Sequence, residues 1–331
     1  MISNYSLHYI KPKKLIAKKS NLAFKNKDVV IEVKSCGMCG TDLKIFKNGS
    51  KRVKKNRVMG HEIAGKIVIA PKNQKYFNKN YNIVLGADIE TEQNKDFALG
   101  HEIDGGSQKY LKINSDLLKK IPHFLTRKKI NYDVASLTEP LACCLNGLQA
   151  INFKKNKNIL IFGAGSIGQL ISKLCIFYKS KKVFLVDKKT LKLKNSFRHK
   201  KLIKLGISKF RNKIKDKIDY IFVACSSPEA QKNAVEYSDY GTTINFFAGL
   251  PKNNGLDPLS KINTNAIHYK QLRIVGSHGS KKEHVEKAAK LIINKKLNLK
   301  KLISKIYKIK DYNIAFKKLA TGKLTKIVIK P

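Results

Sequence analysis

A glycine-rich turn between an apolar strand and an amphipathic helix constrains this chain most. Residues 158–162 form a short continuous apolar run, as expected of a strand buried on both faces, and residues 166–178 repeat apolar side chains at helical spacing. The turn between them reads Gly163-Ala164-Gly165-Ser166-Ile167-Gly168. Such glycines permit a tight bend, close approach of a pyrophosphate, and close packing of helix on strand. The pattern predicts dinucleotide binding by Gly163, Gly165, Ser166, Ile167 and Gly168, and a glycine-rich turn without a ligand is the alternative.

An acidic residue stands where the ribose of such a cofactor would lie. Asp187 ends the next expected strand, residues 182–187, and follows Gly168 by 19 residues. A carboxylate at this place accepts hydrogen bonds from the ribose and repels a 2′-phosphate. We therefore expect NAD in preference to NADP, although Lys188 and Lys189 beside it soften the repulsion.

The pattern of apolar residues changes twice along the chain, and a length of 331 residues fits about two domains. Residues 1–147 carry short β-branched runs, an all-β pattern, with strands expected at 29–33, 63–70 and 81–85. Residues 148–279 alternate strand with helix, with further strands at 218–225 and 242–247, and predict an α/β fold with a parallel sheet. Residues 280–331 contain a helix near 283–294 and a closing strand, 323–329.

A second cluster carries metal-binding side chains. Cys36 and Cys39 form a Cys-x-x-Cys pair, which by itself fits a redox pair or half of a structural zinc site. The chain has no second such pair and no thioredoxin-like context. His61, in Gly60-His61-Glu62, and Glu139 add an imidazole and carboxylates. One thiolate, one imidazole and one or two carboxylates make an open zinc site, which suits alcohol chemistry because zinc lowers the pKa of a bound alcohol.

These motifs together resemble a known family. Cys39-Gly40-Thr41-Asp42, Gly60-His61-Glu62, Glu139-Pro140-Leu141-Ala142 and residues 163–168 occur in the order and spacing of zinc-dependent medium-chain dehydrogenases. The chain is similar to that family over almost its whole length, and most similar to the sorbitol (L-iditol) and threonine dehydrogenase branch. The resemblance implies a GroES-like β-barrel catalytic domain built from residues 1–147 and 280–331. It implies a doubly wound Rossmann domain in residues 148–279.

The resemblance also implies roles for individual residues. Cys39 and His61 are the expected zinc ligands, and Glu62 either ligates directly or swings in during turnover. Glu139 takes the place of the third ligand or of the partner of the metal-bound water. Thr41 would pass the substrate proton towards solvent. At the cofactor, the expected lining residues are Cys225 and Ala248.

The sequence departs from the family pattern at places that affect these expectations. No cysteine lies between Leu85 and Gly105, where the family often carries four, so we expect one catalytic zinc and no structural zinc. A second Gly-His-Glu occurs at residues 100–102. His61 is the better ligand, because it lies 22 residues after Cys39 and between strand-like runs. Lys44 stands where threonine dehydrogenases carry a histidine, which weakens threonine as the substrate.

The expected function is a zinc-dependent oxidoreductase that interconverts a secondary alcohol (a polyol, sugar or cyclitol) with its ketone, using NAD. The alternatives are a zinc-free quinone or enoyl reductase of the same superfamily and, from another class, a basic nucleic-acid-binding protein. The net charge of +45 suggests the last, but the lysines are spread along the chain and no nucleic-acid-binding motif is present. A lysine-covered solvated surface, or attraction of an anionic substrate, accounts for them instead.

Apart from a small-molecule substrate, the resemblance implies a homo-dimer or homo-tetramer as the assembly. No apolar run of about 18 residues and no export signal is visible, and the six cysteines are too few for a disulfide scaffold. These features predict a cytoplasmic protein without a membrane partner.

Overall fold

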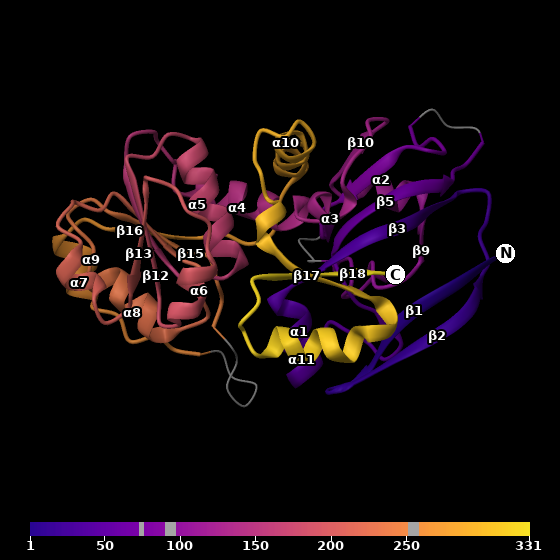
Figure 1. Cartoon of the computed structure of the whole chain (residues 1–331), viewed down its shortest axis with the longest axis horizontal. Helices are drawn as coiled ribbons and strands as arrows, with labels where there is room; N and C mark the ends of the chain where they lie inside the picture. The colour runs from indigo at the N-terminus through magenta and orange to yellow at the C-terminus, as the bar shows by residue number, and fades with distance from the viewer. Residues whose placement is uncertain (73–75, 90–96, 251–257) are drawn as a thin grey trace. The chain divides into compact units, whose positions relative to one another are not determined.

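The structure, a computed structural model, describes residues 1–72, 76–89, 97–250 and 258–331. The chain folds into two compact units, which Figure 1 shows along the chain by colour. The first unit comprises Met1–Ala142 and Gly279–Pro331, and the second comprises Cys143–His278. The change in the pattern of apolar residues had indicated divisions after residues 147 and 279, whereas the observed divisions follow residues 142 and 278. Helix α4 (Thr138–Ala150) crosses the first of them.

The second unit is built on a parallel sheet of six strands in the order β13-β12-β11-β14-β15-β16. Its strands are β11 (Asn158–Phe162), β12 (Lys182–Asp187), β13 (Leu202–Gly206), β14 (Tyr220–Val223), β15 (Thr243–Phe246) and β16 (Arg273–Gly276). All five residues of β11 are buried. A strand covered on both faces reads as an apolar run without alternation, which is how β11 and β12 were recognised over these same bounds.

Helices cover both faces of this sheet. They are α5 (Ser166–Phe177), α6 (Thr190–Asn195), α7 (Phe210–Lys213), α8 (Pro228–Glu236) and α9 (Thr264–Tyr269). The apolar cluster on one face joins Phe184 of β12 to Phe210 of α7 and Ala234 of α8. In Figure 1, α5 and α6 lie on the opposite side of the strands from α7 and α9. This is the doubly wound arrangement expected for residues 148–279.

The first unit is mainly antiparallel. Its strands are β1 (Ile2–Lys11), β2 (Lys14–Leu22), β3 (Asp28–Met38), β4 (Arg57–Val58), β5 (Glu62–Ile69), β6 (Asn82–Leu85), β7 (Asp88–Ile89), β8 (Phe97–Ala98), β9 (Tyr110–Asn114), β10 (His123–Thr126), β17 (Ile303–Lys308) and β18 (Lys326–Lys330). Seven of them form one sheet in the order β10-β6-β5-β3-β18-β17, with β9 also paired to β3. β1 and β2 form a long hairpin that the sequence patterns did not indicate.

Helices in this unit are α1 (Gly40–Asn48), α2 (Ser115–Lys120), α3 (Tyr132–Ala135), α10 (Lys282–Ile293) and α11 (Tyr312–Ala320), with short 3-10 turns at Lys300–Leu302 and Ile309–Asp311. The all-β interpretation of residues 1–147 therefore missed four helices, α1, α2, α3 and α4. The C-terminal segment returns to the first unit through β18, which pairs antiparallel with β3. That pairing sets Ile327 opposite Met38, and so brings the end of the chain beside the Cys36–Cys39 segment.

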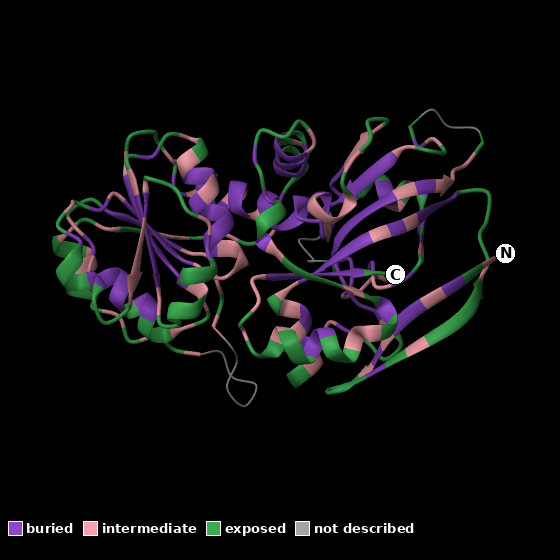
Figure 2. Ribbon diagram, in the orientation of Figure 1, coloured by how far each residue is buried: buried purple, intermediate pink, exposed green. Residues whose placement is uncertain are grey.

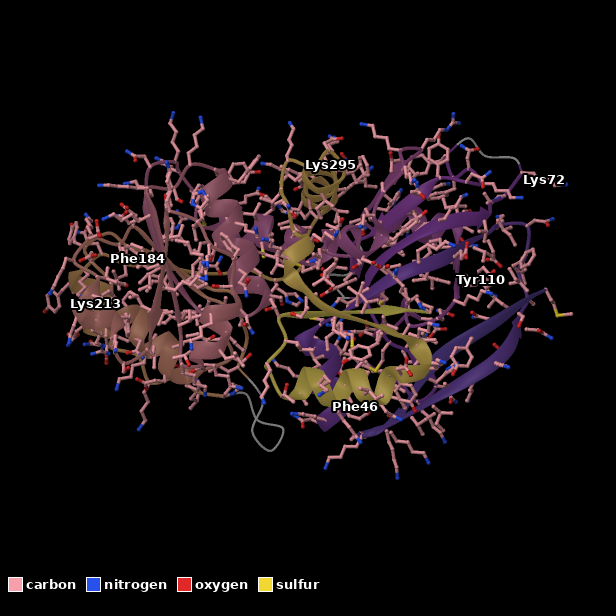
Figure 3. All side chains as sticks on the ribbon, in the orientation of Figure 1. Phe46, Lys72, Tyr110, Phe184, Lys213 and Lys295 are labelled. Carbon is pink, nitrogen blue, oxygen red and sulfur yellow. The ribbon has the colours of Figure 1, made fainter. Side chains whose placement is uncertain are left out.

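Burial follows the layers of each unit. Figure 2 shows the central strands β11, β12, β14 and β15 of the parallel sheet as mainly buried, and the outer faces of its helices as exposed. Charged side chains occupy the outer surface, as Lys72, Lys213 and Lys295 illustrate in Figure 3. Within the described residues, no helix has both the length and the apolar character needed to cross a membrane.

Candidate metal centre and dinucleotide turn

Two neighbouring strands of the first unit bring the expected metal ligands together. Cys39 follows β3 and is the N-cap residue of α1, while His61 and Glu62 stand at the start of β5. β3 and β5 pair antiparallel, with Gly37 opposite Glu62. The ligand atoms of Cys39, His61 and Glu62 all lie within 4.8 Å of one another. Over the described ranges this is the one such group of three or more potential ligands.

The imidazole of His61 is buried among negative groups. Burial by itself would lower its pKa, but the charges of Cys39, Asp42 and Glu139 raise the pKa of His61 well above its usual value. Its Nδ1 lies 4.0 Å from Oδ1 of Asp42, and both atoms are buried without a hydrogen-bond partner among the described residues. A metal-binding histidine usually gives its second N–H to a carboxylate. Asp42 is placed to accept that hydrogen bond.

Glu62 has a partner that the sequence patterns did not indicate. Lys326 at the start of β18 donates to both carboxylate oxygens, with Nζ 2.6 Å from Oε1 and 2.7 Å from Oε2, and also to the backbone oxygen of Met38 at 3.2 Å. Both side chains are buried, at 3% and 0% exposure. Gly37 leaves room for this carboxylate, because a Cβ there would overlap Oε2 of Glu62. We call Cys39, His61 and Glu62 the metal group. The Glu62 carboxylate is therefore shared between the metal group and the buried ammonium of Lys326.

Cys36, the other half of the Cys-x-x-Cys pair, is not in the metal group. Its thiol is buried in the apolar core beside β5, and burial raises its pKa well above the usual value. Both Cys36 and Cys39 are free cysteines. A thiol buried in this way is chemically inert. The geometry thus gives Cys36 a packing role and argues against a redox pair.

Two further expected residues flank the group. Glu139 lies in the first turn of α4 and is 7% exposed; it acts on His61 through its charge but lies outside the group of three. The thiol of Cys39 donates to the hydroxyl of Thr41 at 3.6 Å. These donors (a thiolate, an imidazole and a carboxylate) fit a zinc ion, and the buried unpartnered nitrogen of His61 fits the outer hydrogen bond of a metal ligand.

The structure also places His101 beside His61, with ring centroids 5.8 Å apart and the rings nearly perpendicular. In the sequence, the two Gly-His-Glu motifs had offered His61 and His101 as alternative metal ligands. The repeated motif was therefore the only sequence feature that drew attention to His101. For Lys326 the available signal was a lysine at the head of a closing apolar strand.

The dinucleotide turn lies wholly in the second unit. Gly163 adopts φ +107°, a conformation that L side chains rarely adopt. A Cβ on Gly168 would overlap the backbone oxygen of Gly163, so only glycine lets α5 pack this closely on β11. Ser166 and Ile167 form the first turn of α5, whose N-cap is Gly165. Backbone N–H groups at such a helix start favour a phosphate.

Asp187 ends β12 and ties its carboxylate to the turn. Ala164 N donates to Oδ2 at 2.8 Å, and Lys189 N donates to Oδ1 at 2.7 Å. Each carboxylate oxygen can accept a second hydrogen bond, so ribose hydroxyls can still be bound.

Cys225 and Ala248 follow β14 and β15, at the carboxyl ends where ligands of such sheets bind. A Cβ on Gly163 would lie 3.0 Å from the Cβ of Cys225. Burial and the charge of Asp187 raise the pKa of the Cys225 thiol to about 11, so it stays protonated. Ala248 N donates to Val223 O at 3.0 Å, which holds it beside β14. Both expected cofactor-lining residues therefore stand at the ligand-binding edge of the sheet.

Comparison with known proteins agrees with this geometry. Residues 25–123 match the model of the alcohol dehydrogenase GroES-like domain. A zinc-type alcohol dehydrogenase-like protein of Haemophilus influenzae is 26% identical over 306 residues, covering 86% of this chain and 85% of that protein. A D-xylulose reductase of Saccharomyces cerevisiae is 24% identical over 327 residues, covering 91% and 89%.

A solved structure has the same fold over the full length of both chains. It is a zinc-binding dehydrogenase of Sinorhizobium meliloti bound to NADP, which superposes with a TM-score of 0.88 at 19% identity and 100% coverage of each chain. The first unit is thus the GroES-like domain and the second the Rossmann domain. Residues 25–123 thus match the GroES-like domain of alcohol dehydrogenases, and the chain is similar to zinc-type alcohol dehydrogenases over most of its length.

Proposed function

We propose that this protein is a zinc-dependent oxidoreductase that interconverts a secondary alcohol and its ketone by hydride transfer to and from NAD. The observation that carries the proposal is the group of Cys39, His61 and Glu62, whose ligand atoms lie within 4.8 Å of one another. The same chain holds a glycine-rich turn at the carboxyl edge of a parallel sheet, where nicotinamide dinucleotides bind. A metal group and a dinucleotide turn together are what alcohol–ketone chemistry requires.

In this proposal each residue in or beside the metal group has a separate role. Cys39 and His61 would hold zinc, and Asp42, whose Oδ1 lies 4.0 Å from Nδ1 of His61, would accept a hydrogen bond from that nitrogen. Bound zinc polarises the alcohol oxygen and lowers the pKa of the alcohol. Thr41, beside the Cys39 sulfur, would pass the proton that the alcohol loses towards solvent, taking it up on its oxygen as it gives up its own hydroxyl proton. The third protein ligand is Glu62 or Glu139.

Lys326 bears on the choice of the third ligand. Its ammonium donates to both oxygens of Glu62, so a metal bound through Glu62 has to share that carboxylate. Glu139 lies near enough for its charge to act on His61 but outside the group of three. Zinc affinities of Glu62→Gln and Glu139→Gln, measured on otherwise identical proteins, identify the third ligand as the residue whose change weakens binding more.

For the substrate we propose a polyol, a sugar or a cyclitol. The support is that relatives of this length include a D-xylulose reductase and a sorbitol dehydrogenase. The zinc-free quinone or enoyl reductases of the superfamily lack the ligands that this chain brings together. A nucleic-acid-binding function has no support beyond net charge. The test is a screen of polyols and cyclitols with NAD, followed by absorbance of the reduced cofactor.

Metal analysis tests the zinc centre directly. We expect about one zinc per chain, bound by an open site with three protein ligands. Cys39→Ser should lose the zinc and the activity yet still bind NAD, because the glycine-rich turn lies in the other unit. Cys143→Ser changes a cysteine that lies outside the metal group, so this variant is the matched control and should keep its zinc. Full zinc content in Cys39→Ser would show that the metal group is misassigned.

The preference for NAD rests on the charge of Asp187. Asp187→Asn keeps the shape of the side chain and removes the charge that repels a 2′-phosphate. The ratio of the NADP to the NAD dissociation constant, measured by calorimetry, should fall about tenfold. Asp216→Asn is the control, since Asp216 pairs with Lys182 at the opposite end of β12. An unchanged ratio would place cofactor selection elsewhere.

Two expectations about the whole protein belong to the same proposal. A cytoplasmic location agrees with six free cysteines, because disulfides are rare there. Localisation by fractionation tests it. A homo-dimer or homo-tetramer is the expected assembly, and light scattering after size-exclusion chromatography measures it.

A further inference from the structure

The two Gly-His-Glu turns pack directly against each other. Gly100 adopts φ +76°, and a Cβ on it would lie 2.8 Å from the backbone nitrogen of Gly60 and 3.0 Å from its oxygen. Gly106 N donates to Gly60 O at 2.8 Å, which joins the segment after the second turn to the first. A side chain at position 100 would meet the backbone of Gly60, so the two turns approach closely at Gly60 and Gly100.

The second turn is anchored on its other side by an ion pair. Arg52 donates to Glu102 from Nε to Oε1 at 2.6 Å and from Nη2 to Oε2 at 3.1 Å. Ala98 N donates to the same Oε2 at 2.9 Å, and Gly100 N donates to Ile103 O at 2.8 Å. Because hydrogen bonds hold both Gly100 and Glu102, the backbone on either side of His101 is fixed in position.

That place is against the ring of His61. The rings of His61 and His101 meet edge to face, at 85°. Both ring nitrogens of His101 are buried and have no hydrogen-bond partner among the residues that the structure describes. Burial and the charge of His61 lower the pKa of His101 to about 4.

The unpartnered polar atoms near these rings belong to a single cluster. Besides the nitrogens of His101, Oδ1 of Asp42 and Nδ1 of His61 are buried without a partner in the described part of the chain. The charge of Asp42 acts on both imidazoles. Cys39 N already holds the other oxygen, Oδ2, of Asp42 at 2.8 Å. Buried polar atoms of this kind are costly unless they are satisfied together, and a metal on the far nitrogen of His61 would order them.

We propose that His101 is a positioning residue of the metal centre, which fixes the ring of His61 through its edge-on contact. His101 is not itself a ligand, since it lies outside the group formed by Cys39, His61 and Glu62. The inference rests on the proposed zinc function and extends it to a residue in a different loop. It gives the second Gly-His-Glu motif a role that supports the first.

Zinc affinity is the measurement that tests this role, by competition with a chromophoric chelator. His101→Ala removes the edge-on ring, and we expect zinc binding about 10- to 100-fold weaker, as for other outer partners of metal ligands. His101→Phe keeps a ring at this position and should recover part of the loss. The absorption bands of the cobalt-substituted protein should shift in His101→Ala, because the geometry at His61 changes.

Controls separate this role from folding and from the proposed function. His123→Phe changes another buried histidine of the same unit, one that packs against Phe77 and lies outside the metal group, and should leave zinc affinity unaltered. Circular dichroism of the metal-free variants checks the fold. Zinc affinity within twofold of the unaltered protein in both His101 variants overturns the inference, as does a change confined to KM for the alcohol. Failure of the unaltered protein to bind zinc would instead refute the zinc function itself.

Discussion

Removing the buried ammonium of Lys326 gives the most direct test of how this site is built. Lys326→Met keeps the length and apolar character of the side chain but leaves the carboxylate of Glu62 without its partner. Nζ of Lys326 lies 2.6 and 2.7 Å from the two carboxylate oxygens, and neither side chain is more than 3% exposed. Removing one member of a pair this deeply buried costs about 3–5 kcal/mol, because the remaining charge stays desolvated.

The magnitude translates into a large thermal shift. For a unit of this size each kcal/mol corresponds to roughly 2–4 °C in Tm. The metal-free Lys326→Met protein should therefore unfold about 6–20 °C below the unaltered protein, as followed by circular dichroism in the presence of a chelator. Lys330→Met is the matched control in the same strand: Lys330 pairs with Asp133 at 3.2 Å but is 49% exposed. An exposed pair contributes only about 0–1 kcal/mol, so its Tm should hardly change.

The pH dependence and a double variant sharpen the same test. Burial alone would lower the pKa of Lys326, but the charge of Glu62 raises it above the usual value. A raised pKa means that the stabilisation is present below the unfolded-state pKa and is lost only as the pH rises through the folded-state pKa, in the strongly alkaline range. The Tm deficit should thus be constant between pH 6 and about 9. Glu62→Leu with Lys326→Met should recover most of it. A deficit below about 2 °C in Lys326→Met would refute the reasoning.

Three further predictions follow from the turns. Gly168→Ala should weaken NAD binding at least tenfold, as measured by calorimetry, because the added methyl group would overlap the backbone oxygen of Gly163. The zinc content should stay the same. An NAD affinity equal to that of the unaltered protein would contradict this prediction. Gly100→Ala, at φ +76° and against Gly60, should destabilise the first unit by about 1–3 kcal/mol in urea unfolding, and an unchanged midpoint would speak against the close packing. Burial alone would raise the pKa of Glu102, but the hydrogen bonds from Arg52 lower it. The stabilisation of the folded state by the Arg52–Glu102 pair is therefore present above about pH 4.3, the usual pKa of a glutamate, and is lost as the pH falls. The Tm difference between Glu102→Gln and the unaltered protein should therefore shrink as the pH falls through the lowered pKa of Glu102, and a difference that does not change with falling pH would count against the pair.

Local patterns were sufficient wherever the structure depends on neighbours along the chain. The bounds of β11 and β12 coincide with the apolar runs 158–162 and 182–187, because a strand buried on both faces must be apolar throughout. The motifs around Cys39 and His61 pointed to these residues as ligands through their resemblance to a known family, since the residue types that bind zinc can be read from the sequence. The hairpin of β1 and β2 was not predicted from the sequence. Only one of the nine residues of β2 is buried, so this solvent-exposed strand shows no clear apolar periodicity.

Only the tertiary structure decided which groups surround those ligands. Lys326 reaches Glu62 across 264 residues of sequence because β18 pairs with β3, and nothing in the composition of either strand specifies that pairing. His101 lies against His61 because Gly100 can approach Gly60 without a side chain between them. The identity of a ligand is a property of one residue and can be recognised in the sequence. The charge and the hydrogen bonds that tune it are properties of contacts between distant segments, and these exist only once the sheet and the turns have packed.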